Sequence, residues 1–427
     1  MKRLLLSTLI LASVHAYAGV DLTDSGAEKE YELYGASANA QGEFNNAYKY
    51  SAYATYSGKY VVFHSSSGNN YNSEGKWGHY VKNTLDGSVI RIPAPEGMDD
   101  EKFSKMKIRS MTANGRFLVV DGGVDSTYHV HIMYLYDLKS GKAEIINRDI
   151  DNHIPKVDNS SYRVQVSEDG QYIYYGYYGA TLEHSSQSMN QVYLWDVAKN
   201  IRTRINKDIY GNDFSLLIYS HGQRRISGDG RYLIYATNAD LDADNINIDK
   251  NKTKIYVYDR VTGKSRLITV NLLSNQWIKA TMPAISIDGQ FATYLQDSDK
   301  INRVNLQTLH REIISQDDQG EQLEHCSYPS ISSEGLTLAF TCDERAYLYD
   351  YTGKKLHIGS TSLVDGHNAK TDGTNNLTVL DQGNGMYWRT QKAQLLEGEP
   401  SYPDYQIYLY RQKPGTTSPQ ICFSDDY

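Results

Sequence analysis

The chain has 427 residues, of which 51 are acidic and 43 are basic, so its net charge is −8. No block of basic residues interrupts this balance, and such a chain has little to neutralise the phosphates of a nucleic acid. Tyrosine occurs 37 times against 8 phenylalanines, a bias typical of strands whose rings are half buried. The composition argues against nucleic acid as a partner and favours a large all-β protein.

The first predicted element is a secretion signal over residues 1–18. Two basic residues precede an apolar run from Leu4 to Val14, and residues 16–18 (Ala-Tyr-Ala) form the small-x-small pattern of a signal peptidase site. The apolar run is too short to span a bilayer, and no later stretch reaches about 18 apolar residues. We expect a mature protein that starts at Gly19, is periplasmic or secreted from a Gram-negative bacterium, and has no transmembrane segment.

A hairpin signature then recurs seven times: a short apolar strand, a turn with Gly, and an aromatic-rich strand. RRISGDGRYLIYA and PAISIDGQFATYL are clear copies. Tight hairpin turns need positive φ angles, which Gly supplies, and alternating apolar residues on both sides indicate strands. Successive turns are about 46 to 60 residues apart, the period of a repeat architecture. The turn glycines are Gly58, Gly115, Gly170, Gly230, Gly289, Gly335 and Gly385.

A second hairpin signature lies between the copies of the first, with an aromatic residue and Asp before the turn. The clearest copies contain Asp137, Asp259 and Asp350. Two hairpins per repeat make one four-stranded antiparallel sheet, which buries both faces only when such sheets stack radially. The sequence therefore predicts a single seven-bladed β-propeller over residues 50–427, with six or eight blades as alternatives. Residues 19–49 form a lead-in segment, with a closing strand near residues 30–34.

At this point the chain resembles the TolB-like propellers with their WD40-like PD40 repeats. Residues 226–268 look like a whole repeat of that kind, and the resemblance extends over nearly all of the mature chain. It implies a propeller fold, whereas a fold shared by many activities does not specify a function or a ligand.

Three cysteines in an exported chain suggest one disulfide and one remaining thiol. Cys326 and Cys342 lie symmetrically about Glu334, the centre of a predicted hairpin, so they are expected to face each other across its strands. A bond between them is the preferred interpretation, with a reduced pair as the alternative. Cys422 is then expected to be buried in the last blade.

One acidic loop contains hard oxygen donors at alternate positions, the ligand type that Ca²⁺ prefers. It lacks the Gly and the final Glu of an EF-hand, so a solvated loop with Asx turns is the simpler interpretation. If the protein has a metal site, we expect structural calcium here. The donors are Asp240, Asp242, Asp244 and Asp249, with Asn245 and Asn247 between them. His129 and His131 share a strand face but are too few to define a site.

Two other clusters have a structural and a functional interpretation. The tyrosines could line a stacking surface for sugar rings, but period-two alternation divides them between two sheet faces. The arginines could form a basic patch, although solubility of strand edges explains them more simply. The tyrosines are Tyr172, Tyr174, Tyr175, Tyr177 and Tyr178, and the arginines are Arg202, Arg204, Arg224, Arg225 and Arg231.

Sequence motifs of common catalytic centres are absent: there is no G-x-S-x-G, H-E-x-x-H, P-loop or C-x-x-C. The preferred function is therefore an exported, non-enzymatic propeller that binds a protein, peptide or glycan through loops on one rim. The alternative is a polysaccharide lyase that acts on an anionic glycan with a His or Tyr as base and an Arg against the uronate carboxylate. No residue spacing identifies such a trio. No cofactor is expected besides structural calcium.

Overall fold

The computed structural model describes residues 31–35, 49–55, 59–65, 77–84, 86–125, 130–148, 163–179, 189–206, 224–239, 241, 252–271, 276–359, 378–379, 385–390 and 406–412. The described residues from Tyr31 to Gln412 belong to one compact unit. They are mostly antiparallel strands, and the short α1 (Asp100–Ser104) is the helix among them. In these ranges no helix has the length and apolar character needed to cross a membrane.

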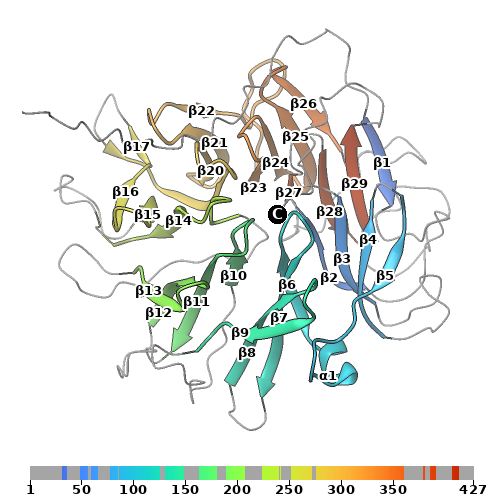
Figure 1. Cartoon of the computed structure of the whole chain (residues 1–427). Helices are drawn as coiled ribbons and strands as arrows, with labels where there is room; N and C mark the ends of the chain where they lie inside the picture. Colours follow the sequence, from blue (N-terminus) through green and yellow to red (C-terminus); the bar gives the residue numbers. More distant parts are fainter. Residues whose placement is uncertain are drawn as a thin grey trace, which may run out of the picture. The chain divides into compact units, whose positions relative to one another are not determined.

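Six antiparallel sheets have four strands each; five consist of consecutive strands, and the sixth joins the blue β1 to the red β29 in Figure 1. The first three are β2 (Lys49–Ala54), β3 (Tyr60–Ser65), β4 (Gly78–Asn83) and β5 (Val89–Arg91); β6 (Lys107–Met111), β7 (Phe117–Asp125), β8 (Val130–Asp137) and β9 (Lys142–Ile145); and β10 (Arg163–Val166), β11 (Tyr172–Gly179), β12 (Met189–Asp196) and β13 (Ile201–Arg204).

The later sheets repeat the pattern. They are β19 (Ala280–Ile285), β20 (Phe291–Gln296), β21 (Lys300–Asn305) and β22 (Arg311–Ile313); β23 (Ser327–Ile331), β24 (Thr337–Cys342), β25 (Arg345–Asp350) and β26 (Lys355–Ile358); and β27 (Thr378–Val379), β28 (Gly385–Thr390), β29 (Gln406–Gln412) and β1 (Tyr31–Gly35). The expected all-β propeller of four-stranded antiparallel blades is confirmed, with six complete four-stranded blades in the described residues.

The fourth repeat differs from the other six. Its sheet has three strands, β14 (Tyr232–Thr237), β15 (Lys254–Asp259) and β16 (Lys264–Leu267), and is followed by the hairpin of β17 (Val270–Asn271) and β18 (Gln276–Trp277). Where the other repeats have an inner strand, a single bridge joins Ile226 to Leu233. Seven complete four-stranded blades were expected, and six is one of the alternatives that the sequence left open. The difference arises because Ile226 forms one bridge to β14, and one bridge is too short to count as a fourth strand.

The strand expected near residues 30–34 is β1, which pairs with β29 along five residues, from Tyr31 opposite Gln412 to Gly35 opposite Tyr408. Residues from opposite ends of the chain therefore share one sheet, which covers the exposed edge of β29. Pairing of this kind removes a free strand edge, the usual site of edge-to-edge association.

The turn glycines are required by contacts between blades. A Cβ on Gly170 would lie 2.3 Å from Cε2 of Phe117, and a Cβ on Gly335 would lie 2.4 Å from Cδ2 of Phe291. In each case the aromatic ring begins the second strand of the preceding blade. The same relation joins Tyr60 to Gly115, Tyr172 to Gly230 and Tyr232 to Gly289. The Gly-x-aromatic signature thus lets one blade pack on the next.

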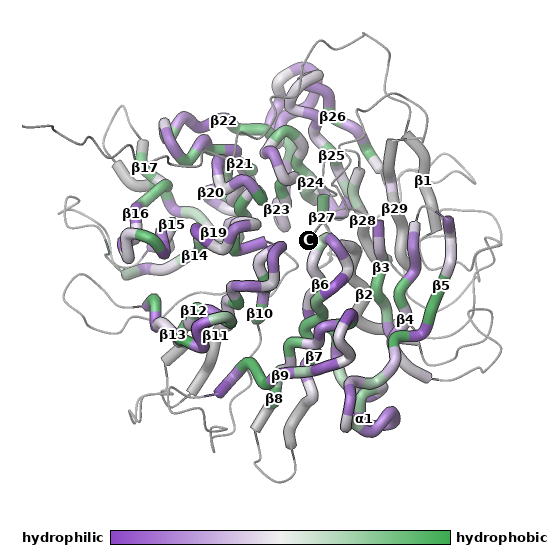
Figure 2. Tube along the Cα trace, in the orientation of Figure 1, coloured by the Kyte–Doolittle hydropathy of each residue, from purple (hydrophilic) through white to green (hydrophobic). Residues whose placement is uncertain are grey.

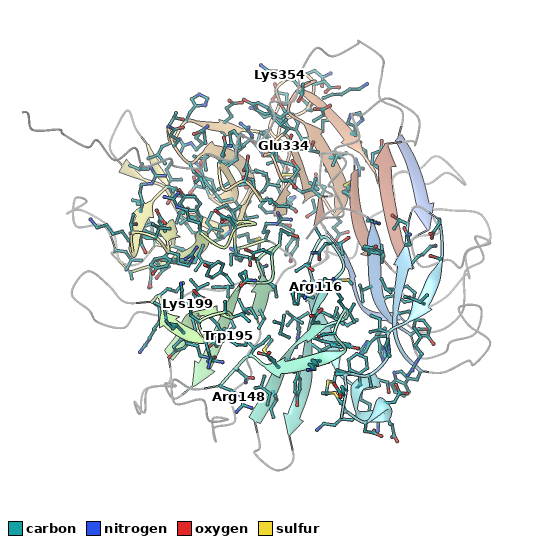
Figure 3. All side chains as sticks on the ribbon, in the orientation of Figure 1. Arg116, Arg148, Trp195, Lys199, Glu334 and Lys354 are labelled. Atoms are coloured by element: carbon teal, nitrogen blue, oxygen red, sulfur yellow. A yellow bond between two sulfur atoms is a disulfide. The ribbon has the colours of Figure 1, made fainter. Side chains whose placement is uncertain are left out.

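The Asp of the second signature forms an ion pair within its own blade. Arg116 contacts Asp137 at 3.0 Å, and Arg231 contacts Asp259 at 3.0 Å. The same guanidinium groups lie over the rings of Phe117 and Tyr232, 4.7 and 4.8 Å from the ring centroids. Figure 3 labels Arg116 at the turn between β6 and β7. Each Arg thereby links the two hairpins of its repeat.

Successive turns are also joined by backbone hydrogen bonds: Glu168 N–H donates to Gly228 O (2.9 Å), Gly228 N–H to Ile287 O (2.8 Å) and Asp288 N–H to Ser333 O (3.1 Å). We call this edge of the sheets the turn side. In an antiparallel meander the hairpins between second and third strands, and the connections between blades, lie at the opposite edge, which we call the connection side. Because interlocked turns occupy the turn side, we expect a ligand to bind on the connection side.

The core consists of apolar clusters that each draw residues from two neighbouring sheets. Tyr174 packs in a cluster with Tyr235 and Leu233, whereas Tyr175 packs in another with Val119 and Trp195. Figure 2 shows hydrophobic green stretches within the strands and hydrophilic purple at many turns. The expected alternation of Tyr174 and Tyr175 between two sheet faces is confirmed, and both are packing residues with 1% and 0% exposure.

Candidate functional site

The best-defined polar arrangement on the connection side is an imidazole held by a carboxylate. His325 lies in the connection from β22 to β23, and its Nδ1 is 2.8 Å from Oδ1 of Asp343. Asp343 lies in the two-residue hairpin between β24 and β25, where Cys342 pairs with Arg345. Both side chains are open to solvent, with exposed fractions of 78% for His325 and 57% for Asp343. We refer to them as the His325–Asp343 pair.

The preceding blade holds the same histidine by its backbone. Oδ1 of Asp299, in the hairpin between β20 and β21, accepts a hydrogen bond from His325 N–H at 3.1 Å. The φ angle of His325 is 49°, in the left-handed region, and those of Asp343 and Glu344 are 46° and 60°. Non-glycine residues with such angles concentrate at sites where the surrounding structure fixes the backbone. Residues from two blades thus determine where the imidazole lies.

The pair has a defined protonation behaviour. The hydrogen bond that His325 donates to Asp343, followed by the negative charge of Asp343, raises the pKa of His325 above the usual 6.5, and the charges of Glu324 and Asp299 act in the same direction. Among the described residues, Nε2 has no hydrogen-bond partner. A carboxylate on Nδ1 with an open Nε2 is the arrangement that orients an imidazole to accept or donate a proton at Nε2.

Two basic side chains begin the strands that leave these hairpins. Lys300 is paired with Gln296 at the start of β21, and Arg345 begins β25. Both are half-buried. Their position at the connection side places positive charge in the same two blades as the His325–Asp343 pair, where it can bind an anionic group.

A second histidine pair lies on the connection side of the first blade but is buried. Nε2 of His79 lies 3.0 Å from Phe103 O, and Nε2 of His64 lies 2.7 Å from Ser104 O, at the C-terminal end of α1. Burial, followed by the neighbouring His64, lowers the pKa of His79 to about 3. Both imidazoles are therefore neutral and hold α1 against the sheet, so this pair is structural.

The arginines predicted at strand edges are placed differently by the structure. Arg224 and Arg225 are buried, with exposed fractions of 3% and 4%, so their interpretation as surface residues was wrong. Arg224 contacts Glu168 of the preceding blade at 3.6 Å, which neutralises a charge between blades. Arg202 lies over the Trp195 ring, 4.5 Å from its centroid, and Arg204 donates to Asn206 Oδ1 at 3.1 Å. These contacts are structural.

The expected Cys326–Cys342 disulfide is confirmed, across 16 sequence positions. Both cysteines are buried, at 2% and 0% exposure, in a cluster with Leu338 and Phe340. Figure 3 labels Glu334 at the turn about which they are symmetric.

The remaining predicted sites cannot be compared with the structure. The acidic loop residues Asp240, Asp242, Asp244 and Asp249 lie outside the described residues, as do His129 and Cys422. His131 lies in β8 opposite Val124, a backbone position only. Within the ranges that the structure describes, no group of three or more His, Cys, Asp or Glu side chains could hold a metal ion.

The sequence already contained the signal for the His325–Asp343 pair. His325 directly precedes Cys326, and Asp343 directly follows Cys342, so the symmetry that predicted the disulfide also places these two residues opposite each other. That step was missed because His325 belongs to no recognised motif.

No family model matches the chain, and no curated protein sequence matches it. Solved structures do. An oligogalacturonate lyase in complex with manganese aligns with a TM-score of 0.51 and 10% identity, over 91% of this chain and 97% of that one. An oligogalacturonate lyase from Vibrio parahaemolyticus aligns with a TM-score of 0.52 and 12% identity, over 90% of this chain and 97% of that one. At these identities the likeness shows a shared propeller fold.

Proposed function

We propose that this protein is a lyase that cleaves an anionic, uronate-containing oligosaccharide by β-elimination, with His325 as the proton-transferring residue. The observation that carries the proposal is the His325–Asp343 pair: an imidazole oriented by a carboxylate, with Nε2 open on the connection side. The whole-length likeness to two oligogalacturonate lyases supports the same reaction class. The polysaccharide lyase, the alternative from the sequence, is thus preferred over a purely binding function.

The reaction needs a base, a positive charge and a leaving group. Neutral Nε2 of His325 takes the proton from the carbon next to the uronate carboxylate, and the electron pair moves into that carboxylate as an enolate. Lys300 or Arg345 neutralises the developing charge. The enolate then collapses to a carbon–carbon double bond and expels the glycosidic oxygen, which takes a proton from the His325 imidazolium and restores the neutral base. Asp343 stabilises the imidazolium formed in the first step.

The pKa of His325 sets the pH dependence of this reaction. Because Asp343 raises that pKa, the neutral form required of a base increases only as pH rises through the raised value. We therefore expect the elimination rate to increase with pH across this range, and Asp343→Asn to move the rise to lower pH while lowering the maximal rate.

The test is incubation of the mature protein with oligogalacturonate and with other anionic oligosaccharides, followed by ultraviolet absorbance of the unsaturated product. His325→Ala should lower the rate by roughly 10² to 10⁴-fold, the usual contribution of a general base. The matched control is His310→Ala, because His310 is also exposed and lies near a carboxylate, 3.5 Å from Glu312, but in the turn between β21 and β22 on the turn side. Equal rates in the two variants, or no product from the parent, would contradict the proposal.

A second candidate is binding of a protein, peptide or glycan without cleavage. It is favoured by the negative charges around His325, namely Asp299, Glu324 and Asp343, which disfavour an anionic ligand at this position. Titration calorimetry with neutral and anionic oligosaccharides separates the two candidates, because heat of binding without unsaturated product supports the second.

Two further assignments belong to the same proposal. The buried disulfide and the signal-like residues 1–18 support export to the periplasm or the medium. The bridge from Ile226 to Leu233, with Ile234 N–H donating to Arg225 O at 2.8 Å, supports residues 224–226 as the inner strand of a seventh blade. The repeat signature at Gly230 supports membership in the TolB-like propellers.

A further inference from the structure

We infer that the Cys326–Cys342 disulfide is the clamp that holds His325 and Asp343 in their hydrogen-bonded geometry, so that both cysteines are positioning residues for the imidazole. The consequence for catalysis rests on the proposed function. The orientation of the imidazole does not, since it can be measured without a substrate.

The covalent chain carries the inference. His325 directly precedes Cys326, and Asp343 directly follows Cys342. The disulfide therefore links the two residues with only one cysteine on each side of the bond. The hydrogen bond between Nδ1 of His325 and Oδ1 of Asp343, 2.8 Å long, joins the residues next to the disulfide. Two buried cysteines, at 2% and 0% exposure, are thereby bonded to residues whose side chains are 78% and 57% exposed.

The disulfide lies beside an irregular stretch of the strand pairing. Register between β23 and β24 shifts between Ser327 and Ser330, so the regular ladder is interrupted at Tyr328 and Pro329. Beyond the interruption only Ser327 pairs with Thr341 before the strand ends, where Ser327 Oγ and Thr341 Oγ1 lie 2.9 Å apart. A strand end with one remaining pair frays easily. The disulfide follows that pair immediately and fixes the end.

Exposed side chains give the second reason. A surface ion pair ordinarily contributes little, because holding two mobile side chains together opposes their rotamer entropy. Here both backbones have positive φ angles, 49° at His325 and 46° at Asp343; the two-residue hairpin fixes the angle at Asp343, and the hydrogen bond from His325 N–H to Asp299 restrains the backbone at His325. With the backbones fixed, less freedom is lost when the side chains meet.

The experiment measures the pKa of His325 by nuclear magnetic resonance titration in Cys326→Ala/Cys342→Ala, a variant that leaves small apolar side chains in the apolar cluster. The matched control is Ser327→Ala/Thr341→Ala, which removes the cross-strand contact at the neighbouring pair and keeps the disulfide. Asp343→Asn serves as the reference for a broken pair. We expect the pKa to fall toward 6.5 in the cysteine variant, as in Asp343→Asn, and to remain raised in the control.

A pKa that remains raised in a folded cysteine variant would overturn the inference, as would a fall of equal size in the control. If the cysteine variant does not fold, the parent protein is reduced under native conditions and titrated in the same way, with the dispersion of its amide spectrum as the check on folding. An unchanged pKa in the reduced, folded parent would overturn the inference equally.

Activity supplies a separate readout. With oligogalacturonate as substrate, the cysteine variant should lose roughly 10²-fold in kcat, the scale of a misplaced catalytic group, with little change in KM. If the parent releases no unsaturated product, the proposed lyase function fails, while the titration still decides whether the disulfide positions His325.

Discussion

Replacement of Gly170 by Ala tests the contact by which one blade packs on the next. Gly170 has a φ of +71°, and a Cβ there would lie 2.3 Å from Cε2 and 2.6 Å from Cδ2 of Phe117. The left-handed backbone alone costs about 1–2 kcal/mol for a residue with a Cβ. Displacing a packed ring adds about 1–3 kcal/mol. We therefore expect Gly170→Ala to lower the free energy of unfolding by roughly 2–5 kcal/mol, from the sum of these two terms.

Gly141→Ala separates the two terms. Gly141 has a φ of +74°, nearly the same, but a Cβ there would have no heavy atom within 4 Å. This variant should lose only the backbone term, about 1–2 kcal/mol. The measurement is urea unfolding followed by tyrosine and tryptophan fluorescence for the two variants and the parent, and for Gly170→Ala combined with Phe117→Ala. Equal losses at Gly170 and Gly141, or an undiminished loss at Gly170 once the Phe117 ring is removed, would refute the inter-blade contact as the reason for glycine.

Three further predictions concern charge and protonation. The pKa of His79 is about 3 in the folded state and near 6.5 in the unfolded chain, so below pH 6.5 the unfolded chain binds more protons at this residue. The contribution of His79 to the free energy of unfolding is therefore fully present above pH 6.5 and decreases as the pH falls, by at most about 1.4 kcal/mol per pH unit. His79→Asn should reduce that slope in urea unfolding at pH 5 compared with pH 7, and an unchanged slope would contradict the buried neutral state. Asp259→Asn, which removes the partner of Arg231, should lower the free energy of unfolding by about 1 kcal/mol or less because both groups are partly open to solvent, and a Lys199→Ala control should lose no more. If the acidic loop binds calcium, the parent should melt at a higher temperature in millimolar Ca²⁺ than in chelator, and the difference should vanish in Asp242→Ala/Asp244→Ala. Identical melting of the parent in both conditions would contradict a calcium site in this loop.

Local sequence was sufficient for the blades because each hairpin is specified within about a dozen residues. The glycines at Gly115, Gly170 and Gly335 all have positive φ, as the turn signature predicted. Alternation of Tyr174 and Tyr175 between two clusters also followed from strand period alone. These features depend on backbone geometry that neighbouring residues determine.

The disulfide was predicted correctly for an incomplete reason. Ile331 pairs with Leu338 and Ser330 with Ala339, a register that by itself would not bring Cys326 opposite Cys342. The shift at Tyr328 and Pro329 moves the pairing by one residue and makes the cysteines meet. The same one-residue shift lies between Tyr50 and Tyr53 and between Thr281 and Ala284, so it is a bulge shared by the first strands of several blades.

What tertiary structure alone decided is the chemical environment of the charged groups. Arg224 and Arg225 belong to the polar residues of the sequence, yet both are buried between blades. His325 looked like any loop histidine until Asp299, from the preceding blade, and Asp343 were placed beside it. Periodicity fixes which way a side chain points within its own sheet, whereas burial and pKa depend on residues brought close by the stacking of separate repeats, and no local pattern encodes those neighbours.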